Sequence, residues 1–131
     1  MVGQVLKNNF DLNDKYTLRD GKIVLSGIQA LVRLLLDQHR LDLIAGLNTA
    51  TLVSGYRGSP VGTLDINLVK NKKILDEHNV KFIPGVNEDL GATMIYGSQM
   101  ANMVSKLRYD GVLGMWYGKA PGVDRSGDIF R

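Results

Sequence analysis

Residues 55–62, "GYRGSPVG", combine side chains and spacing that could hold an anion. Gly55 and Gly58 permit positive φ and can bring backbone N–H groups close to a ligand. Arg57 supplies a positive charge and Ser59 a hydroxyl donor. The turn therefore predicts a pocket for a carboxylate or a phosphate.

Pro60 suits the first turn of the helix expected after this loop, because its missing N–H has no partner to lose there. The positive end of that helix favours an anion as well. A tight turn between a strand and a helix, with a capping serine and a solvated arginine, explains the same residues without a ligand. Both readings remain open on the turn alone.

A second candidate is the pair of acids in "PGVNEDLGATMIYGSQ" at 84–99. Glu88 and Asp89 fall in the first turn of an expected helix, where acids complement the helix dipole and need no further role. Small residues follow in this helix: Gly91, Ala92, Gly97, Ser98 and Ala101. We expect them to form one face that a second subunit can approach, and an acid at its edge would be desolvated, with a raised pKa.

A third polar loop, 118–128, carries Lys119 and Arg125. Neither a dinucleotide fingerprint nor a phosphate-binding Walker loop accounts for these loops. The glycines of 55–62 do not follow the G-x-G-x-x-G pattern. In "GMWYGKA" the two glycines are too close, and Ala120 stands where a Ser or Thr should bind magnesium.

The elements that must position these loops alternate along the chain. Ser26 predicts the N-cap of a helix whose apolar face is formed by residues 28, 31, 32, 35 and 36. Strands are expected at 49–56, 80–86 and 110–118, helices at 61–79 and 87–108, a short strand or an extended piece at 21–27, and a loop that begins a helix at 119–131. This order predicts an α/β fold, a parallel sheet with helices on both faces. In such sheets ligands lie outside the carboxyl ends of the strands, so the three loops should meet at one end.

Composition narrows the class. The chain has 131 residues, a net charge of +3 with interspersed acids and bases, and no cysteine. The absence of cysteine excludes disulfides and thiolate metal sites within the chain, and we expect no metal ligand set in it. The charge bias is too weak to predict nucleic-acid binding. We see neither a membrane-spanning apolar run nor a secretory signal, and expect a cytoplasmic protein. Residues 1–20 are expected to lie on the surface, and 21–131 to form an incomplete domain at the N-terminus of a longer chain.

Three segments in order, "GLNTATLVSGYRGSPVGTLD", "FIPGVNEDLGAT" and "YDGVLGMWYGKAPGVDRSGD", resemble the start of the indolepyruvate ferredoxin oxidoreductase family, in its long fused bacterial form. The resemblance runs from about Tyr16 to Arg131. It implies a thiamine-diphosphate-dependent 2-oxoacid:ferredoxin oxidoreductase that converts an aryl 2-oxoacid such as indolepyruvate to an acyl-CoA. This stretch would be most of the pyrimidine-binding domain. Magnesium and iron–sulfur clusters would lie outside it, so the chain alone should be inactive.

The resemblance gives Glu88 the role of the glutamate against N1′ of the aminopyrimidine. That glutamate stabilises the imino tautomer, whose nitrogen takes the C2 proton and makes the ylid. To share a proton near pH 7 it must be partly desolvated. Asp89 should point elsewhere.

The resemblance also places Gly58 and Pro60 of the first turn at the cofactor. Arg57 and Ser59 replace a proline and a threonine of the family's turn, and they would bind the substrate carboxylate with help from Lys119 and Arg125. Expected partners are the 2-oxoacid, CoA, ferredoxin and a second copy of the chain.

Two other classes compete with the enzyme. A non-catalytic α/β module for a small anion would keep the 55–62 turn but would not need Glu88. A flavodoxin-like domain would need acidic or glycine signatures that the sequence lacks.

Overall fold

A computed structural model describes residues 11–104 and 106–131 of the chain. The elements are α1 (Asp14–Thr17), α2 (Gly27–Ile44), β1 (Ala50–Gly55), α3 (Leu64–Lys70), α4 (Lys72–Glu77), β2 (Val80–Phe82), α5 (Glu88–Val104), β3 (Val112–Tyr117), α6 (Ala120–Arg125) and the 3₁₀ helix η1 (Gly127–Phe130). In the described residues the strands form one parallel sheet in the order β2-β1-β3. The fold is α/β, as the alternation predicted.

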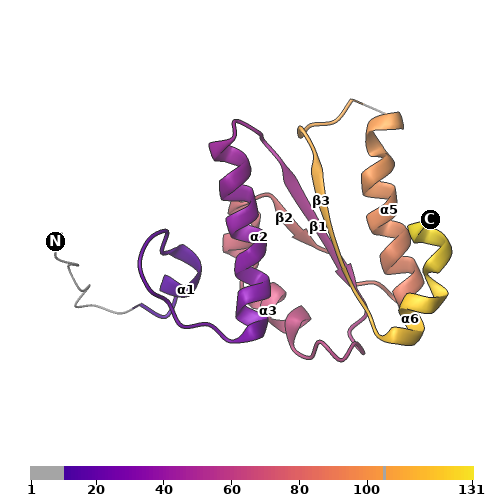
Figure 1. Cartoon of the computed structure of the whole chain (residues 1–131), viewed down its shortest axis with the longest axis horizontal. Coiled ribbons are helices and arrows are strands. Elements are labelled where there is room, and N and C mark those ends of the chain that lie inside the picture. The colour runs from indigo at the N-terminus through magenta and orange to yellow at the C-terminus, as the bar shows by residue number, and fades with distance from the viewer. Residues whose placement is uncertain (1–10, 105) are drawn as a thin grey trace.

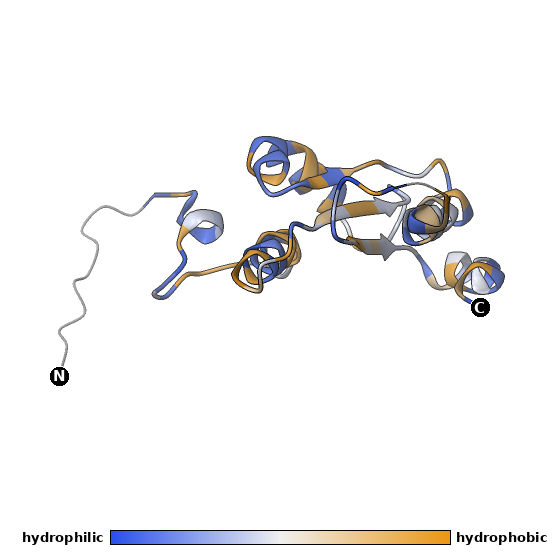
Figure 2. Ribbon diagram, turned by 90° about the horizontal axis from the view of Figure 1, so that it is seen from above, coloured by the Kyte–Doolittle hydropathy of each residue, from blue (hydrophilic) through white to orange (hydrophobic). Residues whose placement is uncertain are grey.

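Helices cover both faces of this sheet (Figure 1). Helices α2, α3 and α4 lie on one face, and α5 and α6 on the other; Figure 2 shows the strands between the two groups. The chain leaves β1 toward β2 and then crosses to the opposite side of β1 for β3. Right-handed crossovers in opposite directions place the two connections on opposite faces. No helix among the described residues is both long and apolar enough to cross a membrane.

Helix α2 begins as its sequence predicts. The Ser26 hydroxyl accepts a hydrogen bond from the Gln29 N–H at 3.3 Å, and the Gln29 side chain accepts one from the Ser26 N–H at 3.0 Å. This capping box satisfies two N–H groups that the first turn leaves free. The predicted apolar face packs inward, with Val32, Leu35 and Leu36 fully buried.

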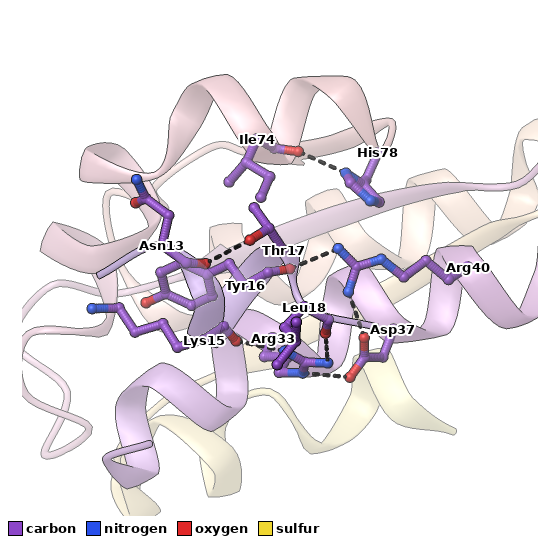
Figure 3. A network of polar contacts seen from close by, with 10 residues as sticks. All are labelled: Asn13, Lys15, Tyr16, Thr17, Leu18, Arg33, Asp37, Arg40, Ile74 and His78. Atoms are coloured by element: carbon purple, nitrogen blue, oxygen red, sulfur yellow. Dashed lines mark hydrogen bonds and ion pairs between the residues drawn. The ribbon is translucent and has the colours of Figure 1, made fainter. Parts of the chain in front are cut away.

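The segment before α2 packs on the folded unit: most of residues 11–20 are exposed, as expected of a surface segment, but Asp14 and Tyr16 are buried. Tyr16 is only 2 % exposed and belongs to the apolar core. Two arginines of α2 hold this segment by its backbone (Figure 3). Arg33 donates to the carbonyls of Lys15 and Leu18, both at 2.7 Å, and Arg40 to the carbonyl of Tyr16 at 2.6 Å. Residues 1–10 of the expected surface segment lie outside the described residues.

The arginines are themselves positioned by one acid. Asp37 lies between them on α2 and accepts from Arg33 at 2.9 Å and from Arg40 at 2.7 Å. Its two carboxylate oxygens are thus each used once, and the guanidinium planes are fixed toward the backbone carbonyls.

Three local expectations need correction. Residues 21–27 form no strand. The helix expected at 61–79 begins only at Leu64 and breaks at Asn71, whose side-chain amide donates to the Asn67 carbonyl at 2.8 Å. An asparagine that bonds the carbonyl four residues back competes with the helix ladder. The segment 119–131, expected as a loop that begins a helix, contains more helix than that: it folds into α6 and η1, with a proline in the first turn of α6, where it is tolerated.

A histidine pair, buried His39 of α2 and half-buried His78 at the C-cap of α4, joins the two helices at the amino end of the sheet. His39 is 5 % exposed, and its ring meets that of His78 edge-on, with the ring centres 5.5 Å apart. The Asn79 amide faces Nε2 of His39 at 3.3 Å, and Nδ1 of His78 lies 2.9 Å from the Ile74 carbonyl. Burial first, and then the neighbouring His78, lower the pKa of His39; Asp42 acts in the opposite sense, and Arg40 lowers it further.

We predict that the free energy of unfolding decreases as the pH is lowered from neutral, because of His39. Its folded pKa lies below the ordinary 6.5, so the unfolded chain binds this proton more readily. The contribution of His39 to stability is therefore complete above pH 6.5. It is lost as the pH falls from 6.5 toward the lower pKa of the folded state. Urea denaturation at several pH values between 7.5 and 5.5 should show this slope, and His39→Gln should flatten it. Equal slopes for both proteins would contradict the assignment.

Candidate functional site

The three predicted loops meet at the carboxyl end of the sheet. An isolated parallel bridge joins Tyr56 to Gly85, and the Gly85 N–H donates to the Gly55 carbonyl at 3.0 Å. This brings the loop after β1 beside the loop after β2. The loop after β3 is adjacent because Gly118 packs against Glu88 in the first turn of α5. The clustering expected from a parallel sheet is confirmed.

The turn 55–62 is built differently from the expectation. The positive-φ residues of the described chain are Thr63, Asn79, Gly21 and Gly46, so Gly55 and Gly58 are not needed for backbone conformation. Gly55 is needed for space, because a Cβ there would stand 2.6 Å from the ring of Tyr117. Likewise, a Cβ on Gly58 would stand 2.4 Å from the ring of Tyr56.

Pro60 also lies elsewhere than expected. Helix α3 begins at Leu64, so this exposed proline stands in the turn and not in the first turn of a helix. The residue before α3, Thr63, has φ of +67°, and its side chain makes no capping hydrogen bond. The loop therefore ends in a strained residue that the sequence did not predict.

Arg57 and Ser59 occupy contrasting environments in this turn. Arg57 is exposed, and its Nε lies 3.8 Å from a carboxylate oxygen of Asp65 on α3. Ser59 is buried, and its hydroxyl accepts from the Val61 N–H at 3.3 Å. The long ion pair leaves the Arg57 guanidinium available to another anion, whereas the Ser59 hydroxyl is partly used within the turn.

Glu88 lies on the opposite face, beneath helix α6. A Cβ on Gly122 would stand 2.2 Å from Glu88 Cγ, and one on Gly118 would stand 3.1 Å from it. The indole N–H of Trp116 donates to the Glu88 carbonyl at 3.1 Å. Glu88 is half-buried, and within residues 11–104 and 106–131 no donor lies within hydrogen-bond distance of its carboxylate.

Asp89, by contrast, is fully engaged. Its carboxylate accepts from Arg125 at 2.6 Å and from the buried Ser126 hydroxyl at 3.3 Å, which ties α6 to α5. Arg125, a candidate substrate ligand, is thus already paired. Lys119 is exposed at the N-cap of α6, and in the described part of the chain it meets no acid.

The predicted site residues therefore form two groups at one end of the sheet. Glu88, Lys119 and Arg125 lie on the face of α5 and α6, and Arg57 and Ser59 lie on the face of α3. Gly58 and Pro60 belong to the turn of the second group. The two groups are separated by the ends of β1 and β3, where Gly55 pairs with Tyr117.

Tyr117 and Ser54 are polar residues at this end that sequence reasoning missed. The hydroxyls of both are buried without a hydrogen-bond partner in the described residues. Burial, and next the carboxylate of Asp65, raise the pKa of Tyr117 to about 12, while Arg57 opposes the shift. Tyr117 is therefore a neutral hydrogen-bond donor at physiological pH. The alternation of β3 could have indicated it, since Trp116 and Tyr117 must point to opposite faces.

The expected small-residue face of α5 does not exist as one surface. Gly91 and Ala92 are buried against the sheet, where a Cβ on Gly91 would stand 3.2 Å from the Ser54 hydroxyl. Gly97 is exposed with open space around it, and Ala101 is half-exposed. Successive helix positions 100° apart put these pairs on different sides of the helix, so they cannot form the common interface that was expected.

Among the described residues no three His, Asp or Glu side chains gather as a metal ion would require. Comparison of the chain with protein-family models, with curated proteins and with solved structures finds no match. The interpretation of the site therefore rests on its own geometry and on the motifs of the sequence.

We predict that Gly122→Ala destabilises the protein by about 1–3 kcal/mol, the usual range for overpacking. The new methyl group would meet the Cβ and Cγ of Glu88, atoms that cannot move without shifting α5 or α6. Gly127→Ala is the matched control, because nothing lies within 4 Å of its Cβ position. Thermal denaturation of both variants measures the contrast, and equal melting temperatures would show that α6 does not pack on Glu88 as described.

Proposed function

We propose that the chain supplies the aminopyrimidine side of a thiamine-diphosphate-dependent 2-oxoacid:ferredoxin oxidoreductase, with Glu88 as the acid that holds the cofactor ring. The observation that carries the proposal is the contrast between two neighbouring acids. Asp89 is engaged by Arg125 and Ser126, whereas the carboxylate of Glu88 meets no donor in the described residues. Glu88 is therefore the acid that remains available to a ligand.

The surroundings of Glu88 suit an aminopyrimidine. The acid lies at the carboxyl end of a parallel sheet, where ligands of α/β folds bind. Trp116 and the Cγ of Glu88 both approach the position where Gly118 would carry a Cβ, so an aromatic ring lies near the Glu88 side chain. Helix α6 and the indole of Trp116 cover part of this acid, so a ring bound against its carboxylate would be partly shielded from water.

When bound, the cofactor supplies the electron sink for decarboxylation of a 2-oxoacid. The role of this chain is to orient the aminopyrimidine ring and to exchange one proton between the Glu88 carboxylate and a ring nitrogen. The α6 backbone at Gly122 restricts the rotamers of this side chain, and a restricted acid needs less reorganisation to act.

The substrate side of the proposal rests on Arg57. Its guanidinium is exposed and its pair with Asp65 is long at 3.8 Å, so the carboxylate of a 2-oxoacid can compete for it. Lys119 is a further exposed cation at the same end of the sheet, whereas Arg125 would first have to leave Asp89. The same proposal includes CoA and ferredoxin as partners, and magnesium and iron–sulfur clusters as cofactors. It also includes a cytoplasmic location and assembly with a second copy of the chain.

We predict that Glu88→Gln in the enzyme that contains this chain lowers turnover by a factor on the order of 10²–10⁴, the usual contribution of a general acid–base group. The amide can still hydrogen-bond a ring nitrogen, but it cannot accept and return a proton. The measurement is reduction of a viologen dye, dependent on an aryl 2-oxoacid, CoA and thiamine diphosphate.

Asp89→Asn is the control. It weakens a partly exposed ion pair, so it should lower stability by about 0–1 kcal/mol and turnover only slightly. Circular dichroism of both variants establishes that the fold is retained. If the two substitutions reduce turnover by the same small factor, Glu88 is only a helix-start acid, and the alternative of a non-catalytic module for a small anion is favoured.

A further inference from the structure

A cavity of about 520 Å³ lies away from the carboxyl end of the sheet, between α2 and the segment that precedes it. Its polar wall consists of Arg19, Arg33, Arg40 and Asp37. Three guanidinium groups face one carboxylate, so the wall carries two uncompensated positive charges. Volumes of 300–1,000 Å³ are usual for sites that bind small molecules.

Some of the guanidinium N–H groups in this wall have no hydrogen-bond acceptor within the described residues. Both oxygens of Asp37 are taken by Arg33 and Arg40, which leaves no acid in the wall for Arg19. Nε of Arg40 is buried and has no acceptor among the described residues, and Arg19 is exposed without one there. An arginine has five N–H donors, so this wall presents several of them to a ligand anion.

The other wall is aliphatic. Leu41, Leu43 and Ile44 line it from the last turn of α2, and they are 60 %, 53 % and 83 % exposed. Exposed apolar side chains gathered beside a cavity are typical of ligand sites. No aromatic residue lines the cavity in the described part of the chain, so it offers no ring on which a nucleotide base could stack.

We propose that this cavity binds a medium-chain aliphatic carboxylate. The carboxylate accepts from the exposed guanidinium of Arg19, and the alkyl chain covers Leu41, Leu43 and Ile44. The charge of the wall selects an anion, and the aliphatic wall selects an extended apolar body over a sugar or a base. Arg33 and Arg40 are only 13 % exposed, so the anion meets them in a partly desolvated place where charge-assisted hydrogen bonds are strong. The site is independent of thiamine diphosphate and of the proposed oxidoreductase activity.

The test is calorimetric titration of the 131-residue chain with sodium decanoate below its micellar concentration. We expect saturable binding of one decanoate per chain, and affinity at least tenfold lower for decanol, which lacks the charge. Arg19→Gln should weaken decanoate binding at least fivefold without changing the melting temperature, because Arg19 is exposed and makes no contact within residues 11–104 and 106–131 that holds the fold. Leu43→Gln should weaken it by removing part of the aliphatic wall. Arg33 and Arg40 are not substituted in this test, because they hold the segment before α2.

Lys22→Gln is the matched control, since it removes an exposed positive charge three positions from Arg19 in the sequence without altering the lining. It should leave decanoate affinity unchanged. The proposal is overturned if decanoate does not saturate, or if Lys22→Gln weakens it as much as Arg19→Gln. It is also overturned if inorganic phosphate or AMP binds as tightly as decanoate with the same dependence on Arg19.

Discussion

The absence of a side chain at Gly122 is the constraint on which the candidate site depends. The backbone of α6 lies directly on the side chain of Glu88, at a separation that no Cβ could occupy. This contact brings Arg125 and Ser126 within reach of Asp89, and so it decides which of two adjacent acids is engaged. With a larger residue at 122, α6 would stand away from α5 and both acids would face solvent.

The end of the sheet divides the remaining polar groups between two faces. Trp116 and Tyr117 are neighbours in β3, yet one donates to the backbone of α5 and the other belongs to the core beside α3. Side chains of successive strand residues must point in opposite directions. A ligand that reaches both Glu88 and Arg57 would therefore have to pass over the ends of β1 and β3, where Gly55 leaves the room that the Tyr117 ring fills.

Local signals in the sequence predicted the elements well. Ser26 and Gln29 form their capping box within four residues, and the apolar spacing of α2 and the order of strands and helices follow from short stretches. What was missed depends on contacts between distant residues. The burial of Tyr16 is decided by Arg33 and Arg40, more than fifteen positions away, and no local pattern near residue 16 encodes it.

The position of the candidate site was predictable from the sequence, but the contacts within it were not. The parallel topology required the three loops to meet, and they do. The roles of the glycines were not predictable, because the ring that excludes a side chain at Gly55 comes from β3. The pairing of Arg125 with Asp89 needs α6, and only a loop that begins a helix was expected there. The assignment to thiamine diphosphate chemistry stays a prediction from the sequence motifs.

Arg33 and Arg40 hold the segment before α2 by its main chain and not by its side chains. Arg33 and Arg40 bind carbonyl groups at residues 15, 16 and 18, and every amino acid offers the same carbonyl. Within residues 11–26, only the phenol ring at position 16 enters the core. Selection can thus maintain the attachment through three residues of α2 and one aromatic ring, while the identities at 15 and 18 are free to drift between related chains. Sequence divergence in this stretch would then be a poor guide to whether the attachment itself has been lost.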